Sequence, residues 1–183
     1  MVGEGGTKGT EHEQNRYHRR RYFHRRHLHR HLRTCIRQEA PPGLELLYRS
    51  VVRLGPAVEV GETARGMRRF IPITGGTFEG PDIRGEILPM GWDWQLDRAD
   101  GCTEVLANYF LRTDDGVVIN VVNTGALCRP GADGAAPPVR TTPVFEAPLG
   151  KYDWLSKGGY IGTLGFDPSS DVPSVVITVY RAN

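Results

Sequence analysis

The chain has 183 residues, of which 39% are hydrophobic and 24% charged, and its net charge is +2. These values are typical of one soluble globular domain with a sizeable core. No run approaches the roughly eighteen consecutive apolar residues that a membrane span needs. The N-terminus also lacks the apolar segment of a secretory signal. We therefore expect a cytoplasmic protein with no membrane partner.

The charges divide the chain into two regions. Residues 1–37 hold ten Lys and Arg against three acidic residues (10 − 3 = +7), and residues 38–183 hold thirteen against eighteen (13 − 18 = −5). All six histidines lie in the first region, and all thirteen prolines follow residue 40. This change in composition predicts a basic, His/Arg-rich disordered extension over residues 1–40 and one folded domain over residues 41–183.

The extension allows several interpretations. Residues 16–37 read RYHRRRYFHRRHLHRHLRTCIR, which resembles an arginine-rich nucleic-acid arm or a nuclear-localisation patch. His27, His29 and His31 share one face only if the segment is extended, so metal binding is a minor alternative. The simplest interpretation is a solvated, disordered extension with too few apolar residues to bury, or a translation start upstream of the real protein. Nucleic-acid contact is therefore considered for this tail alone.

Beyond residue 40, apolar and polar residues alternate with the period of two that is typical of strands. The longest such segments are Leu44–Leu54, Thr103–Thr113, Val117–Val122 and Pro173–Arg181. Shorter ones are Phe70–Thr74, Gly76–Phe78, Ile83–Leu88, Asp93–Asp97, Thr141–Glu146 and Tyr160–Leu164. Asp100-Gly101 and Asp115-Gly116 are typical hairpin turns, since glycine accepts the positive φ of a tight turn. No window long enough for a major helix has helical periodicity.

About ten short strands with few helices predict a mainly β fold, either a sandwich or a single small antiparallel β-barrel. In a small barrel the inward-facing alternate residues fill the interior or line a ligand cavity. The Gly75-Gly76 pair lacks the lysine and helix of a phosphate loop, so it indicates a bulge or a barrel bend. Residues 124–140 have no periodicity and predict a long loop.

Four motifs in order resemble the domain of unknown function 3237 family, also called uncharacterised protein family 0311. They are GETARGMRRFIPITGGTFEGPDIRGEILPMGWDWQLDRADG at residues 61–101, LRTDDGVVIN at 111–120, RTTPVF at 140–145 and YDWL at 152–155. The resemblance spans roughly Leu44 to Arg181 and excludes the tail. It implies a calycin-like (lipocalin-like), mostly antiparallel barrel. It also implies a role in small-molecule or secondary metabolism, as is thought for a few relatives.

The residue types absent from the domain restrict its chemistry. Without histidine after residue 31, the domain cannot hold a Ser-His-Asp or Cys-His nucleophile system, nor His-ligated zinc or iron. No redox cofactor fingerprint is present, so we expect no metal and no cofactor. Cys35, Cys102 and Cys128 are widely separated and indicate neither a disulfide framework nor a zinc ribbon, which favours a reducing compartment. Carboxylates, tyrosines and arginines remain, and these groups suit proton transfer.

Asp93 is the first candidate for a catalytic acid or base. It stands between Trp92 and Trp94, and aromatic neighbours would desolvate the carboxyl and raise its pKa; capping a turn or pairing with an arginine is the structural alternative. Glu79 is a second candidate acid, with a salt bridge at a turn as its alternative.

The candidate substrate-binding residues are basic or aromatic. Arg69 and Arg140 can bind an oxyanion through a bidentate fork, or pair with Asp93 or Glu79 in a structural network. Trp94, Tyr152 and Trp154 are candidate pocket walls, and the last two share a face if the chain is extended there. Core packing is the alternative for at least one of them.

These residues predict a cofactor-independent small-molecule enzyme of hydratase, dehydratase, isomerase or cyclase type. Its expected substrate is carbonyl-bearing or phenolic and binds in an aromatic-lined pocket. A barrel that binds a small ligand without chemistry is the second hypothesis, and nucleic-acid contact through the tail is the third. The chain is also a possible homo-oligomer.

Overall fold

The computed structural model describes residues 40–132, 134–166 and 170–183, and residues from Ala40 to Asn183 form one compact unit. The predicted basic extension lies outside the described residues except for Ala40. Among the described residues, no helix is long and apolar enough to cross a membrane.

The domain is built from ten strands, as the alternation predicts. They are β1 (Leu44–Leu54), β2 (Val58–Thr63), β3 (Gly66–Glu79), β4 (Arg84–Ile87), β5 (Gly91–Asp97), β6 (Cys102–Thr113), β7 (Val118–Cys128), β8 (Arg140–Glu146), β9 (Tyr160–Phe166) and β10 (Ser174–Ala182). One 3-10 helix, η1 (Asp153–Lys157), lies between β8 and β9. The predicted loop at residues 124–140 is shorter than expected, because β7 continues to Cys128.

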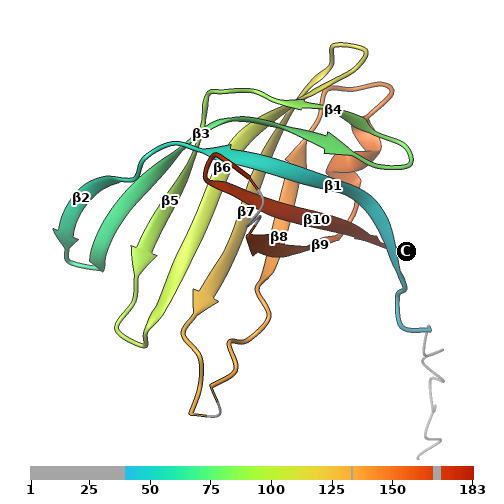
Figure 1. The fold of residues 1–183 in the computed structure, drawn as a ribbon. Helices are drawn as coiled ribbons and strands as arrows, with labels where there is room; N and C mark the ends of the chain where they lie inside the picture. The colour runs from blue at the N-terminus through green and yellow to red at the C-terminus, as the bar shows by residue number, and fades with distance from the viewer. Residues whose placement is uncertain (1–39, 133, 167–169) are drawn as a thin grey trace, which may run out of the picture. The chain divides into compact units, whose positions relative to one another are not determined.

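All strand pairs are antiparallel and the sheet closes on itself (Figure 1). The closed path runs β1-β10-β9-β8-β7-β6-β5-β3 and returns to β1 through the β1–β3 pair. Beyond the end of β5, β4 pairs with both β3 and β6. Beyond the end of β1, β2 pairs with β3. The predicted single antiparallel barrel is thus confirmed.

Gly75 and Gly76 mark the bend in β3. Their φ angles are 127° and 155°, in the region that favours glycine. The β1–β3 register shifts at this point, and β3 changes partner there from β5 to β4. A Cβ on Gly76 would lie 2.1 Å from the Val51 carbonyl oxygen. The prediction of a bulge or bend is confirmed, and the two predicted strands at residues 70–74 and 76–78 are one bent strand.

Both predicted Asp-Gly hairpin turns are present, at Gly101 (φ 83°) and Gly116 (φ 86°). The second turn sets a β6–β7 register in which Cys102 lies opposite Cys128, and these two residues form a disulfide. The expectation that the cysteines form no disulfide is therefore wrong for this pair. Since disulfides are typical of oxidising compartments, the cytoplasmic localisation stays a prediction only.

The barrel interior has a closed half and an open half. The closed half is filled by Phe78, Phe145 and their neighbours, with the Phe145 and Tyr160 rings 4.7 Å apart edge to face. η1 covers this end with the fully buried Leu155. The open half lies toward the β5–β6 turn and the β7–β8 loop, at the lower side of Figure 1.

Candidate functional site

A cavity of about 300 Å³ occupies the open half of the barrel. Most of its wall is aliphatic, and Asp93 is the one carboxylate among the described residues that line it. The lining residues are Val52, Leu54, Ile71, Ile73, Asp93, Gln95, Thr103, Val105, Ala107, Tyr109, Asn123, Leu127, Thr141, Leu164, Phe166, Val175 and Ile177. No arginine or lysine is among them, so the cavity suits an uncharged, largely apolar molecule.

The strand register explains why side chains do not fill the centre of the cavity. Asp93 pairs with Ala107, and Ala107 pairs with Asn123, so the three lie in one inward-facing row across β5, β6 and β7. The methyl group of Ala107 leaves space between its two polar neighbours. With about 4.8 Å between strands, the backbones of Asp93 and Asn123 are about 10 Å apart.

Asp93 is a desolvated carboxyl. Burial raises its pKa, and the Gln95 amide and the Leu106 backbone act in the opposite direction. Oδ2 accepts a hydrogen bond from Gln95 Nε2 at 2.7 Å, whereas Oδ1 is buried and has no partner at hydrogen-bonding geometry. A carboxyl with a raised pKa inside a cavity can donate and accept a proton.

Unpartnered polar atoms gather at this cavity. Among the described residues, six buried side-chain oxygens have no hydrogen-bond partner, and four of these line it: Asp93 Oδ1, Tyr109 Oη, Asn123 Oδ1 and Thr141 Oγ1. The other two are the hydroxyls of Tyr48 and Tyr160. Because buried polar groups are normally paired, this concentration indicates that a ligand supplies the missing bonds.

Tyr109 is a neutral phenol in this cavity. Burial raises its pKa to about 12, and the nearby Tyr48 hydroxyl acts in the opposite direction. The two phenols affect each other without meeting hydrogen-bond geometry. Tyr109 can therefore donate a hydrogen bond to a ligand, but it cannot serve as a base near neutral pH.

The Arg69 side chain does not line the cavity but contacts Gln95, which does. Its guanidinium pairs with Asp97 and with Glu59, and Nη1 lies 3.5 Å from Gln95 Oε1. Thr103 also donates to Asp97, at 2.7 Å. A donor at Oε1 turns the Gln95 amide nitrogen toward Asp93. Arg69 thus orients Gln95, rather than Asp93 directly.

The two tryptophans beside Asp93 are not the source of its desolvation. Alternation along β5 directs Trp92 and Trp94 to the opposite face from Asp93. Trp92 is 42% exposed, and Arg68 stacks over the Trp94 ring at 5.2 Å. Aliphatic lining residues such as Ile71, the register partner of Asp93 on β3, surround the carboxyl instead. The prediction of an aromatic wall around Asp93 is wrong for this reason.

The remaining predicted site residues lie away from the cavity. Glu79 is exposed at the end of β3, opposite Arg49 and Arg84 in the register. Arg140 is exposed, and its one described hydrogen bond is to the Val139 carbonyl. The structure thus does not bring these two side chains together with Asp93.

Tyr152 and Trp154 lie at the closed end of the barrel. The chain there forms η1 rather than an extended segment, so the predicted shared face is not present. Tyr152 is buried and Trp154 is partly buried against the core, with Arg181 stacked on its ring at 5.4 Å. Both residues follow the core-packing alternative.

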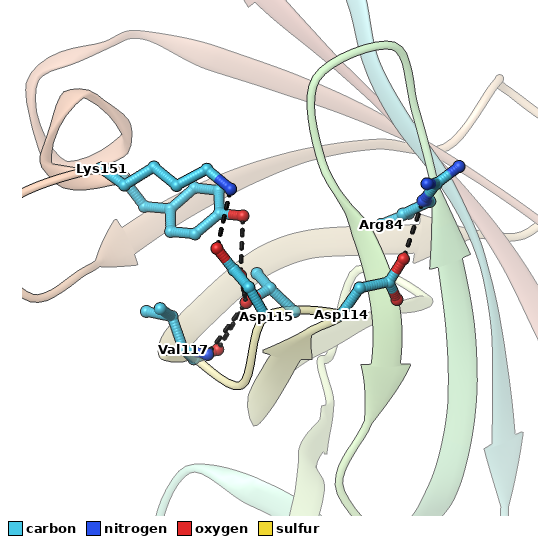
Figure 2. Close-up of polar contacts among 7 residues, drawn as sticks. Arg84, Asp114, Asp115, Val117 and Lys151 are labelled. Atoms are coloured by element: carbon cyan, nitrogen blue, oxygen red, sulfur yellow. Dashed lines mark hydrogen bonds and ion pairs between the residues drawn. The ribbon is translucent and has the colours of Figure 1, made fainter.

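The Tyr152 hydroxyl belongs to a polar cluster at this closed end. It donates to Asp115 Oδ1 at 2.9 Å, while Lys151 Nζ donates to Asp115 Oδ2 at 2.7 Å. Figure 2 shows Lys151 reaching Asp115, with Arg84 paired to Asp114 at 2.7 Å beside them. These bonds hold the pKa of Asp115 well below its ordinary value. Each carboxylate already has a partner, so the cluster is structural.

Sequence reasoning missed Gln95, Tyr109, Asn123 and Thr141 as site residues. A signal was available in the alternation: Tyr109 and Asn123 occupy the inward-facing positions of β6 and β7 with Ala107 and Val121. A polar residue at an inward position is unusual enough to predict a lined cavity. Among the described residues, no group of three or more metal-binding side chains is placed to hold a metal ion.

Known proteins match the same part of the chain, which is the β-barrel domain. The model of a family described as "Protein of unknown function (DUF3237)" matches residues 42–182. A UPF0311 protein of Rhodopseudomonas palustris is 36% identical over 135 residues, which cover 67% of this chain and 88% of that protein. The solved structure of a β-barrel-like protein from Acinetobacter baumannii superposes with a TM-score of 0.71 at 31% identity, over 80% of this chain and 99% of that one.

One more distant relative has a named activity. A hydroalkoxylation enzyme from Penicillium herquei is 28% identical over 123 residues, which cover 67% of this chain and 74% of that protein. Hydroalkoxylation is the addition of an O–H bond across a carbon–carbon double bond.

Proposed function

We propose that this chain, which belongs to the DUF3237 family and has a distant relative named as an enzyme, is a cofactor-independent enzyme for small molecules and that Asp93 moves the proton. The observation that carries the proposal is the burial of the Asp93 carboxyl in a mostly aliphatic cavity, where Oδ1 has no partner at hydrogen-bonding geometry. This burial raises the pKa of Asp93, and a carboxyl with a raised pKa is suited to general acid and base catalysis.

The reaction that we propose is the addition of a substrate hydroxyl to an alkene of the same molecule. Protonated Asp93 donates its proton to one alkene carbon, and the substrate hydroxyl oxygen forms a bond to the other. The hydroxyl proton then passes to the Asp93 carboxylate, which restores the acid. No atom is gained or lost, so the product is a cyclic isomer of the substrate and neither an oxidant nor a cofactor is consumed.

The cavity supports this chemistry through exclusion of water and absence of strong charge. Its aliphatic walls, including Ile71 and Val105, keep water from capturing a developing cation on the alkene. Tyr109 can donate a hydrogen bond to a substrate oxygen. Neither Arg69 nor Arg140 is among the described residues that line the cavity, so stabilisation of an oxyanion by these arginines is not part of the proposal.

The test is conversion of ortho-alkenyl phenols, followed by chromatography for a product of unchanged mass. We expect wild type to form the cyclic ether and Asp93→Asn to lose at least about 100-fold in rate. Glu86→Gln, an exposed carboxylate paired with Arg112 outside the cavity, is the matched control and should keep the wild-type rate. Full activity of Asp93→Asn would contradict the proposed role.

The same assay separates the enzyme from a non-catalytic barrel. If wild type binds these phenols in the cavity but converts none of them, a small-ligand-binding function is favoured instead. Nucleic-acid contact through the basic tail concerns residues outside the described part of the chain. It predicts salt-dependent retention on heparin that is lost when residues 1–40 are deleted.

A further inference from the structure

Asn123 and Thr141 are two cavity residues that the proton-transfer proposal leaves without a role. They are 3% and 2% exposed, and both line the cavity. Asn123 Oδ1 and Thr141 Oγ1 have no hydrogen-bond partner among the described residues. Leaving such atoms unpaired in a buried site is costly, so their retention points to a ligand that pairs with them.

The register makes the two side chains neighbours, but their oxygens face different directions. Thr141 on β8 pairs with Gly125 on β7, so it is the diagonal neighbour of Asn123 on the inner face. A Cβ on Gly125 would lie 2.9 Å from Thr141 Cγ2, and a Cβ on Gly162 of β9 would lie 2.1 Å from Thr141 Oγ1. The threonine therefore turns its methyl group toward β7 and its hydroxyl toward β9, so Asn123 Oδ1 needs a partner of its own.

Asn123 selects a hydroxyl group on the ligand. Its Oδ1 can only accept, so its partner must donate a proton. A ligand hydroxyl can donate this proton, whereas a carbonyl or an ether cannot.

We infer that Asn123 binds an anchoring hydroxyl of the substrate, on the far side of Ala107 from Asp93. This inference rests on the proposed function for the reacting end of the substrate. It narrows the substrate class to aromatic or aliphatic molecules with two oxygen functions: one that reacts near Asp93 and one that does not react. The spacing of about 10 Å between the two backbones corresponds to roughly one fused-ring system between those functions.

The test uses 2-naphthol and 2-methylnaphthalene, which have nearly the same shape and differ in the hydroxyl. Equilibrium dialysis with fluorescence detection of the probe gives the two affinities for the full chain. We expect wild type to bind 2-naphthol at least about tenfold more tightly. Asn123→Leu should reduce this preference at least about fivefold, because it removes one buried hydrogen bond.

Retained binding of 2-methylnaphthalene by Asn123→Leu shows that the cavity is still folded. Thr142→Val changes a side chain that is exposed on the outer face of β8, and it should keep the wild-type preference. Equal affinity of wild type for the two probes, or failure to bind either, overturns the inference. A preference that survives in Asn123→Leu overturns it as well.

Asp93→Asn distinguishes this inference from the proposed function. We expect this variant to keep its preference for 2-naphthol while losing conversion of alkenyl phenols. If it loses both the preference and the conversion, the hydroxyl binds at Asp93, so the inference fails and the catalytic proposal stands. If it keeps both the preference and the conversion, the catalytic role fails and the hydroxyl site stands.

Discussion

The closed and open halves of the barrel use polar residues in opposite ways. At the closed end, Asp115 has three side-chain partners, including Lys151 and Tyr152, and Arg84 pairs with Asp114 (Figure 2). In the open half, Asp93, Asn123, Thr141 and Tyr109 each leave one buried oxygen unpaired. The closed end therefore uses its polar groups for structure, and the open half keeps them for a ligand.

Side-chain size separates the two halves as well. Phe78, Phe145 and Tyr160 fill the closed half, while Ala107 and Gly125 occupy inner-wall positions in the open half. The same alternation of inward and outward residues thus produces a packed core in one half and a cavity in the other. Single substitutions can remove these differences one at a time.

Filling the cavity should have the largest effect. Ala107→Leu places three more carbons between Asp93 and Asn123, so we expect the affinity for 2-methylnaphthalene to fall at least about 30-fold. Far-UV circular dichroism should show an unchanged β-barrel. Leu106→Ala, at the outward-facing neighbour, is the control and should keep the affinity. Unchanged binding by Ala107→Leu would mean that the probe does not occupy this cavity.

Removing the charge of Asp93 should stabilise the fold in a pH-dependent way. Because the folded state raises the pKa of Asp93, the free energy of unfolding is largest below the ordinary aspartate pKa and decreases as pH rises through the raised pKa. We expect Asp93→Asn to raise Tm by about 2–5 °C at pH 8 and by much less at pH 4. Differential scanning calorimetry at the two pH values tests this. A lower Tm at pH 8 would mean that the ionised carboxylate stabilises the barrel.

Disrupting the closed-end cluster should have the smallest effect. The Lys151 and Asp115 side chains are 67% and 41% exposed, so solvent and salt screen their attraction. We expect Lys151→Ala to change Tm by less than about 2 °C and to leave naphthol affinity unchanged. Since the pKa of Asp115 is lowered, any contribution of the pair is present above the ordinary carboxyl pKa and is lost as pH falls. A change in probe affinity would show that the two halves are coupled.

The sequence by itself determined the strands and their main turns. Period-two alternation and the two Asp-Gly dipeptides are local signals, because strand pleating and the positive φ of a tight turn depend on neighbouring residues alone. The bend at Gly75-Gly76 is local for the same reason. The motifs over residues 61–155 also indicated the family, and the family match over residues 42–182 confirms this resemblance.

The disulfide depends on the β6–β7 register, which can be derived from the sequence but is not evident from the cysteine spacing. The turn at Asp115-Gly116 pairs Arg112 with Val118, and the same register places Cys102 opposite Cys128 at the far end of the hairpin. Counting outward from the turn would have paired the cysteines. Their separation of 26 residues conceals this, because distance along a hairpin does not measure distance across it.

Only the tertiary structure decided which polar residues share the cavity. Asp93 could be singled out from the sequence, but its desolvation comes from residues on other strands, such as Ile71 on β3 and Val105 on β6, and not from its tryptophan neighbours. Arg69 and Glu79 belong to the same strand as Ile71, but Arg69 lies two residues nearer the start of the strand, where it pairs with Asp97, and Glu79 lies beyond the bend, where it is exposed. Asn123 and Thr141 meet Asp93 only because barrel closure places β5, β7 and β8 around one interior. Closure is a property of the whole sheet, and no local pattern specifies it.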